Sequence, residues 1–212
     1  MIPIQNIYYM LSYAFQVLNE QGYKNIATEQ FNNTGELMAA ILEKGIAIQL
    51  KRGLGKEYIL QTEALSSLRG KIDIAESIKT QSMLRKQLIC TYDEFSVNSI
   101  MNRIIKSTVE LLLRSNISKQ RKKNLRKLMV YFSEVDFIDL YTVNWNVQYN
   151  RNNQTYRMLI SICYLVVKGL LQTQSNGHTE LMDFLDEQRM CRLYEKFILD
   201  YYRKEFKNQF TA

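Results

Sequence analysis

Few side chains in this sequence could catalyse a reaction or bind a metal ion, and most of them lack the neighbouring residues that such sites require. A magnesium-dependent nuclease site needs clustered carboxylates and a nearby lysine that orients water. Glu205 and Lys207 have the E-x-K spacing of such sites, but they fall in a helical pattern rather than on a strand. Asp183 and Asp186 precede the same pattern, where acidic residues favour the positive end of a helix dipole. We therefore expect no catalytic residue and no metal ligand here.

Two further kinds of site are excluded by spacing. Gly53-Leu-Gly-Lys56 hints at a phosphate-binding loop, but that loop requires G-x-x-x-x-G-K-[ST]. Leu50 stands at the first glycine position and Glu57 at the hydroxyl position. A nucleophilic triad needs a histidine base, and the single histidine, His178, lies in the turn-like sequence Asn-Gly-His-Thr. We expect His178 to be a surface or loop residue.

The composition is that of a folded protein without a membrane segment. The chain has 212 residues, a single proline and 8 glycines, which is enough to form one large domain or two small ones. Cys90, Cys163 and Cys191 are widely spaced and odd in number, so we expect reduced thiols rather than disulfides or a zinc site. Apolar runs of 18 residues and signal-peptide features are absent from the sequence. These features predict a cytoplasmic protein.

One segment accounts for the whole formal charge of +7. Seven basic residues and no acidic residue lie between residues 114 and 127. They are Arg114, Lys119, Arg121, Lys122, Lys123, Arg126 and Lys127. One interpretation is a patch that binds nucleic-acid phosphates without sequence preference. The other is a solvated helix start and turn, since no aromatic side chains are interleaved for base stacking.

Hydrophobic periodicity predicts an α+β fold that is mainly helical, with short strands. Asn6 is expected to cap a first helix and Thr34 a second, which ends near Gly45. Further helices are expected over 74–80, 98–114 (capped by Asn98), 119–132, 156–171 and 188–206. Strands are expected over 57–63, 68–74 and 88–92, and an extended segment over 137–149.

Five segments, in order along the chain, resemble the McrC family, the second subunit of McrBC-type modification-dependent restriction systems. The chain opens with IPIQNIYYMLSYA and continues with LKRGL followed by Tyr58. The remaining segments are SLRGKID (67–73), TYDEF (91–95) with NRIIKS (102–107), and LYEKFILDYYR (193–203). The resemblance spans nearly the whole chain.

This resemblance implies a function in phage defence through restriction of DNA that carries 5-methylcytosine. McrC-like subunits dock on a hexameric McrB-like AAA+ GTPase and stimulate its GTP hydrolysis. Family members continue into a PD-(D/E)xK endonuclease domain, and this chain stops at Ala212, where that domain should begin. We therefore expect no cofactor in this chain. Mg²⁺ would belong to the nuclease domain and GTP to the partner, while DNA is met within the complex.

The resemblance also implies an element that projects into the ring. The best candidate is the segment 51–71, which contains Gly53, Gly55 and Gly70, as a projecting hairpin needs. Its cations, which could contact the ring, are Lys51, Arg52, Lys56, Arg69 and Lys71. The alternative is that Arg52 and Arg69 make structural ion pairs with Glu57, Glu63 or Asp73.

On this basis we divide the chain into a docking region over 1–80, which carries the projecting strands, and a helical body over 81–212. The body should abut the nuclease domain, so we expect Leu193, Phe197 and Tyr201 of the last helix to be partly uncovered. Two other functions are considered, a stand-alone basic nucleic-acid-binding module and a nuclease with an unrecognised site. The resemblance favours the docking subunit.

Overall fold

The computed structural model describes residues 4–14, 18, 23, 26, 28–150, 153 and 155–173. Several sequence predictions lie outside these residues. They concern the arm before Ile4, His178, Cys191, the carboxylates Asp183 and Asp186, the last helix with Leu193, Phe197 and Tyr201, and the pair Glu205 and Lys207.

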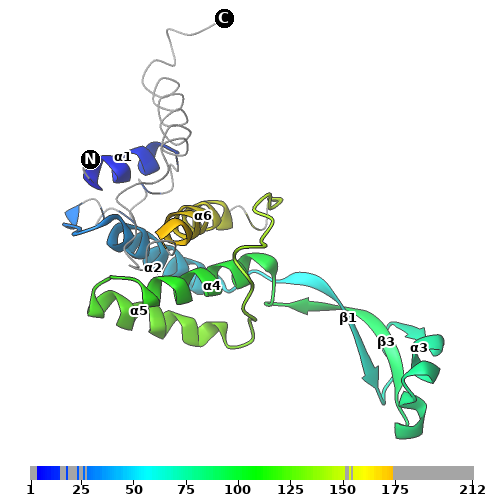
Figure 1. Ribbon diagram of the computed structural model, residues 1–212. Coiled ribbons are helices and arrows are strands. Elements are labelled where there is room, and N and C mark those ends of the chain that lie inside the picture. Colours follow the sequence, from blue (N-terminus) through cyan, green and yellow to red (C-terminus); the bar gives the residue numbers. More distant parts are fainter. Residues whose placement is uncertain are drawn as a thin grey trace, which may run out of the picture.

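Among the described residues, five α-helices form a helical body from which a β-sheet projects (Figure 1). The helices are α1 (Ile4–Ala14), α2 (Thr34–Arg52), α4 (Ile100–Arg114), α5 (Lys119–Met129) and α6 (Tyr156–Thr173). Helix α2 packs against both α5 and α6, and α4 also contacts both. Among the described helices, none is both long enough and apolar enough to cross a membrane.

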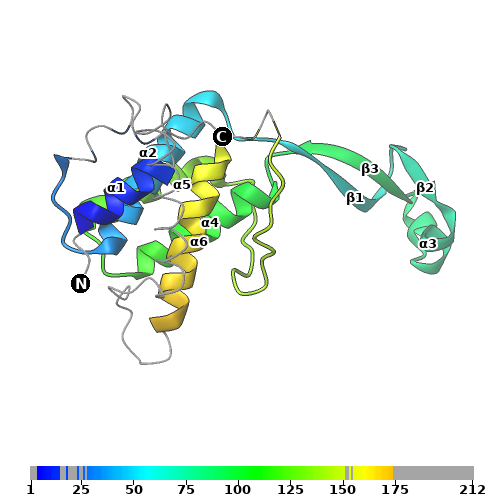
Figure 2. The same cartoon turned by 90° about the horizontal axis from the view of Figure 1, so that it is seen from above.

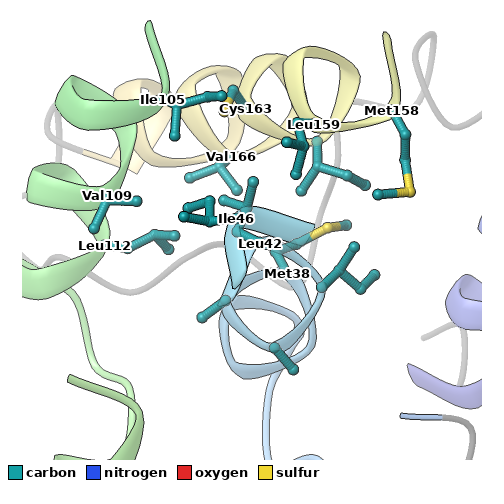
Figure 3. Close-up of a cluster of buried hydrophobic side chains, with 14 of the residues drawn as sticks. Met38, Leu42, Ile46, Ile105, Val109, Leu112, Met158, Leu159, Cys163 and Val166 are labelled. Carbon is teal, nitrogen blue, oxygen red and sulfur yellow. The ribbon is translucent and has the colours of Figure 1, made fainter. Parts of the chain in front are cut away.

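The core of the body lies where α2, α4 and α6 meet (Figure 3). Side chains from these three helices point toward one another at helical spacing, which the apolar periodicity of the sequence predicts. The buried core residues labelled there are Met38, Leu42, Ile46, Ile105, Val109, Leu112, Met158, Leu159, Cys163 and Val166. The body therefore presents one continuous core to which the arm is attached.

Helix α2 is longer than predicted, because Gly45 packs inside it rather than ending it. A Cβ at Gly45 would lie 2.4 Å from Cδ2 of Leu159, so glycine allows α6 to approach closely. The helix ends instead at Gly53, whose φ of 89° favours glycine. Lys51 and Arg52 consequently belong to the last turn of α2 and not to the projecting element.

The projecting element, here called the arm, is an antiparallel sheet with its tip helices. Strand β1 (Glu57–Leu65) pairs along its length with β3 (Leu88–Ser96), from Glu57 opposite Ser96 to Leu65 opposite Leu88. The short β2 (Lys71–Asp73) pairs with the other edge of β3, giving the order β1-β3-β2. Helix α3 (Ile74–Lys79) and the 3₁₀ helix η3 (Ser82–Arg85) lie between β2 and β3. Figures 1 and 2 show the arm extending away from the body.

This architecture confirms the prediction of a mainly helical α+β fold with a projecting hairpin-like element. The arm reaches Ser96, because β3 is its central strand, and the proposed division of the chain at residue 80 stays a prediction. Three predicted N-caps are wrong. Helix α1 already begins at Ile4, before Asn6. Asn33 rather than Thr34 caps α2, and Ser99 rather than Asn98 caps α4. The segment 137–149 contains no strand, although its apolar side chains Trp145 and Val147 pack against the core.

Candidate partner-docking arm

The arm is joined to the body by a buried group of hydrogen bonds at its root. The Tyr156 hydroxyl of α6 donates to Oδ1 of Asn102 in α4 at 2.8 Å and accepts from the Gly55 amide at 2.7 Å. Nδ2 of Asn102 donates to the carbonyl oxygens of Gly55 at 2.9 Å and Val97 at 2.8 Å. Gly55 precedes β1 and Val97 follows β3, so Asn102 binds both chain segments that enter the arm.

A second set of contacts holds the end of α2 against the same root. Nε2 of Gln49 donates to the Gly53 carbonyl at 2.8 Å, and the Thr155 hydroxyl donates to Oε1 of Gln49 at 2.8 Å. A Cβ at Gly55 would lie 2.9 Å from Cε2 of Tyr156, so the backbone and the ring are in close contact there. Because buried polar groups cost free energy when they lose their partners, these bonds restrict the direction of the arm.

One face of the arm is apolar although it is exposed. Tyr58 and Phe95 are directly opposite across β1 and β3, with ring centroids 4.9 Å apart, and Tyr58 is 74% exposed. Leu60 lies on the same face and is 67% exposed, and the Lys56 ammonium lies 5.8 Å from the Phe95 ring centroid. Exposure of such a face to water is unfavourable, and its burial under a partner lowers the free energy.

The tip carries the highest concentration of exposed apolar side chains on the arm. They come from the turn before β2 and from α3 and η3, and are Leu68, Ile74, Ile78, Met83 and Leu84. Leu84 is 81% exposed. Around them are the cations Arg69, Lys71, Lys79, Arg85 and Lys86, against only two acids, Asp73 and Glu76, over residues 66–87. The tip is therefore both apolar and positively charged.

The tip is ordered by a small polar core rather than by apolar burial. Asp73 accepts a hydrogen bond from the Glu76 amide at 2.9 Å and so caps α3. The buried Ser77 hydroxyl donates to the Asp73 carbonyl at 2.6 Å and accepts from the Ile89 amide at 2.7 Å. The Ser82 hydroxyl, also buried, donates to the Ser77 carbonyl at 3.2 Å. These bonds fix α3 and η3 on β3 while their apolar side chains face outward.

The five cations predicted to contact a partner are placed at both ends of the arm. Lys51 and Arg52 are exposed at its base, on α2, and Lys56 precedes β1. Arg69 and Lys71 are exposed at the tip, about one strand length away. The structure therefore separates them into a basal and a terminal group. Their role in contacting a partner stays a prediction.

Arg69 packs on an aromatic ring instead of forming an ion pair. Its guanidinium carbon lies 4.1 Å from the ring centroid of Tyr92, whose hydroxyl donates to the Glu63 carboxylate. That hydrogen bond raises the pKa of Tyr92 above its ordinary value. Neither Arg52 nor Arg69 makes an ion pair within the described residues, which include all three of the acids considered as partners. A stacked guanidinium keeps its N–H donors available.

The basic segment is divided by the structure. Arg121 is only 16% exposed and contacts three carboxylates, Glu29 at 2.9 Å, Glu43 at 3.0 Å and Glu36 at 3.5 Å. Burial alone would lower the pKa of Arg121, but the hydrogen bonds to Glu43 and Glu29 outweigh it and raise the pKa. Arg114 pairs with Glu110 at 3.0 Å on α4. The other five residues, Lys119, Lys122, Lys123, Arg126 and Lys127, lie together on α5.

The sequence prediction missed Asn102 and Tyr156, which position the arm. A weak signal exists, since Asn102 occupies a position on the buried face of α4 beside Met101 and Ile105, where an apolar residue is expected. A polar side chain at such a position requires buried partners. No feature of the sequence indicates that those partners are Gly55 and Val97.

The fold and the arm define a class of protein, a helical body with a projecting β-sheet. Within the described residues no group of three or more His, Cys, Asp or Glu side chains could hold a metal ion. A family model for the McrBC 5-methylcytosine restriction system component matches residues 5–212. The chain therefore belongs to this family, and the resemblance to McrC is confirmed.

Individual relatives agree with this assignment. The chain is 28% identical over 214 residues to the type IV methyl-directed restriction enzyme EcoKMcrBC of Escherichia coli K12, covering 100% of this chain and 62% of the relative. It matches a chain in the McrBC complex of Thermococcus gammatolerans with a TM-score of 0.64 and 22% identity, over 94% of this chain and 57% of the other.

A second Thermococcus gammatolerans structure, a half-complex of McrB AAA+ hexamers with bound McrC, matches with a TM-score of 0.58 and 20% identity. That match covers 96% of this chain and 48% of the other. The two structural matches support the fold. This chain spans about three fifths of the length of the Escherichia coli relative.

Proposed function

We propose that this protein is an McrC-like subunit of a restriction system that acts on DNA containing 5-methylcytosine. In this proposal the arm docks on a hexameric McrB-like AAA+ GTPase and stimulates GTP hydrolysis. DNA cleavage, with its Mg²⁺, belongs to a nuclease domain and not to the residues that the structure describes. The observation that carries the proposal is the arm, which holds an exposed apolar tip away from the body on a hydrogen-bonded root.

The surface of the arm has the composition of a protein interface. Exposed aromatic and aliphatic side chains surrounded by cations are typical of the centre and rim of such a surface. Tyr58 and Phe95 are rigid aromatic groups that lose little entropy on binding, and Leu84 offers a nearly complete side chain for burial. The membership in the McrBC family and the structural match to McrC bound to McrB hexamers support an AAA+ ring as the partner.

The cations of the arm are suited to acidic or carbonyl groups of the partner. Arg69 is held on the Tyr92 ring and has no carboxylate partner among the described residues, so it can donate to a new acceptor without first breaking an ion pair. Lys71 lies opposite Thr91 on the neighbouring strand and is exposed. In the proposal Arg69 and Lys71 contact the ring close to where its subunits bind nucleotide. Lys51 and Arg52, at the base of the arm, contact the outer surface of the ring.

The test is GTP hydrolysis by the cognate AAA+ partner with and without this chain. Leu84→Asp places a charge in the apolar tip, and we expect it to weaken docking by at least about tenfold, or about 1.4 kcal/mol. Val130→Asp makes the same change at an exposed apolar residue of the body and is the matched control. Arg69→Ala should retain docking through the apolar tip and lower the stimulated rate.

Two results would contradict the proposal. In one, the chain does not bind the ring or change its GTP hydrolysis. In the other, Leu84→Asp and Val130→Asp have equal effects on binding, which would place the contact outside the arm. Binding without stimulation would restrict the role of this chain to docking.

A further inference from the structure

Helix α5 has two faces of different character, and only one of them is used inside the protein. The inner face carries the buried Leu125 and the ion-paired Arg121, and Nδ2 of Asn124 donates to Glu43 of α2 at 2.9 Å. The N-terminal residue Ser118 is also bound to α2, through hydrogen bonds to Glu36 at 2.7 and 2.8 Å. Because α2 holds α5 in this orientation, the remaining face of α5 points away from the core.

That outer face is a continuous row of cations, here called the basic stripe. Its members are Lys119, Lys123, Arg126 and Lys127, all exposed, and Lys122 lies half-buried beside them. Each of them lies three or four residues from another member, so they share one side of the helix. The stripe spans eight residue steps, or about 12 Å along the helix axis. Figure 1 shows α5 at the edge of the body opposite α6.

The basic stripe is unfavourable for the isolated helix. Lys119 and Lys123, Lys122 and Arg126, and Lys123 and Lys127 are like-charge pairs at i, i+4, each of which destabilises a helix by a few tenths of a kcal/mol. Lys119 adds a positive charge in the first turn, where the helix dipole favours an acid, and that turn contains no acid. A face that only needed solubility could mix both charge signs.

No acid inside the described part of the chain neutralises the stripe. Three carboxylates that contact the inner face of α5, Glu29, Glu36 and Glu43, are bound to Arg121, and Glu110 is bound to Arg114. None of the stripe residues forms an ion pair within the described residues. The positive charge of the stripe is therefore available to an external anion.

We propose that the basic stripe of α5 binds the phosphate backbone of double-stranded DNA without regard to sequence. Duplex DNA carries one negative charge per about 1.7 Å of its axis, so a row of cations about 12 Å long faces several phosphates. Tyr131 is exposed just beyond the end of α5, and its hydroxyl can donate to a further phosphate. Aromatic side chains are not interleaved with the cations, which favours backbone contacts over base stacking.

This contact goes beyond the proposed docking function and does not depend on it. The arm and the stripe use different residues on different elements, so one surface can fail while the other is correct. In a restriction complex, a sequence-independent contact would hold the DNA close to the subunit while modification is read elsewhere. The stripe would accordingly add affinity and salt dependence but no discrimination between modified and unmodified DNA.

The test is fluorescence anisotropy of a short labelled DNA duplex, titrated with residues 1–212 at several salt concentrations. The stripe variant combines Lys119→Gln, Lys123→Gln, Arg126→Gln and Lys127→Gln. The control variant removes the same charge from the arm through Lys71→Gln, Lys79→Gln, Arg85→Gln and Lys86→Gln. Glutamine has nearly the helix propensity of lysine and arginine, so the stripe variant should keep its circular dichroism spectrum. The same measurement is made on the arm variant, whose substituted residues lie mostly outside α-helices.

We expect the stripe variant to weaken binding by about tenfold or more at low salt. The slope of log Kd against log salt should fall by about 1 for each DNA phosphate that the variant no longer neutralises. The arm variant should change Kd much less, and duplexes with and without 5-methylcytosine should bind equally. Equal losses of affinity in both variants would overturn the proposal, since binding would then follow net charge alone. Unchanged DNA binding by the stripe variant would also overturn it.

A second measurement separates DNA from an acidic protein surface as the partner of the stripe. Binding of each variant to the AAA+ ring is measured by analytical ultracentrifugation without DNA. The proposal predicts that the stripe variant keeps ring binding, and the docking function predicts that the arm variant weakens it. If the stripe variant loses ring binding and keeps DNA binding, the stripe contacts the ring and the proposal is wrong. Ring binding that is unchanged in the arm variant would instead contradict the docking function.

Discussion

The hydroxyl of Tyr156 and Oδ1 of Asn102 lie 2.8 Å apart in a buried hydrogen bond that joins α6 to α4 at the root of the arm. The same hydroxyl accepts the Gly55 amide, and the same Asn102 side chain donates to two backbone carbonyls. Two side chains from the body thus form four hydrogen bonds at the point where the chain enters and leaves the arm, one to each other and three to the backbone of Gly55 and Val97.

We predict that Tyr156→Phe loosens the arm and lowers the free energy of unfolding by about 1–3 kcal/mol, because the Gly55 amide and Asn102 Oδ1 lose a buried partner. Tyr131→Phe, at an exposed tyrosine, is the control. Urea denaturation gives the free energy, and hydrogen exchange at the Gly55 amide, which donates to this hydroxyl, reports on the root. Slow exchange retained at that amide in Tyr156→Phe would show that this hydroxyl does not hold the arm.

A second prediction concerns Gly70, which lies between Arg69 and β2 with a φ of 67°. A Cβ there would lie 2.4 Å from the backbone oxygen of Thr91, so Gly70→Ala should displace β2 from β3 and cost more than about 1 kcal/mol. Gly53→Ala is the matched control, because its φ is also positive but no atom lies within 4 Å of the added Cβ.

Hydrogen exchange over Lys71–Asp73 distinguishes the two variants. Gly70→Ala should expose the β2 amides without changing exchange in α2 or α4. Equal protection of β2 in Gly70→Ala and in the original chain would show that the arm accommodates the methyl group.

A third prediction concerns Arg121. Arg121→Gln removes the cation from a group of three carboxylates, and we expect a loss of roughly 2 kcal/mol in the free energy of unfolding, since a half-buried pair costs less to break than a fully buried one. Lys123→Gln, on the outer face of the same helix, should be nearly neutral. Thermal denaturation at matched salt measures both. Equal melting temperatures would indicate that solvent screens the Arg121 contacts.

A fourth prediction concerns alkaline pH. Burial raises the pKa of the Cys163 thiol to about 12 from its ordinary value of 9.0, and burial also raises the pKa of Tyr156. Above about pH 9 the unfolded chain loses these protons while the folded chain keeps them, so the free energy of unfolding falls as pH rises. Below about pH 9 the contribution of Cys163 is fully present. One group that is protonated in the folded chain and ionised in the unfolded chain changes the free energy of unfolding by up to about 1.4 kcal/mol per pH unit.

Urea denaturation between about pH 8 and pH 10 measures this slope. Cys163→Ala should lower stability at every pH, because it leaves a small cavity, and should make the slope shallower. A free energy that stays constant over this range in the original chain would contradict the expected proton linkage.

Helix positions were predictable where the apolar residues repeat at a single helical period. The apolar spacing of α4 and α6 gave both helices to within two residues, and the alternation of β1 gave its start at Glu57. The arm was also predictable in outline, because the resemblance to McrC implies a projecting element and the glycines between Gly53 and Gly70 indicate its position. The resemblance to McrC supplied the class of protein, which the spacing of residues could not.

The errors have a common physical origin in contacts between distant segments. Gly45 was expected to end α2, but Leu159 of α6 packs on it and the helix continues. Arg121 was grouped with the exposed cations, but α2 supplies it with two carboxylates and the segment before α2 with a third. Asn102 and the outward-facing side chains of η3 could not be assigned for the same reason, since their neighbours are determined by the tertiary fold.

The length of β1 determines how far the tip of the arm moves when the root rotates. Nine paired residues extend over about 30 Å, so a rotation of about 10° at Asn102 moves the tip by about 5 Å, which is one interstrand spacing. A displacement of that size would shift Arg69 and Leu84 from one set of neighbours to the next on any partner. The arm thus has the geometry of a lever whose pivot lies in the body, so a small rotation at α4 or α6 would be magnified at the tip.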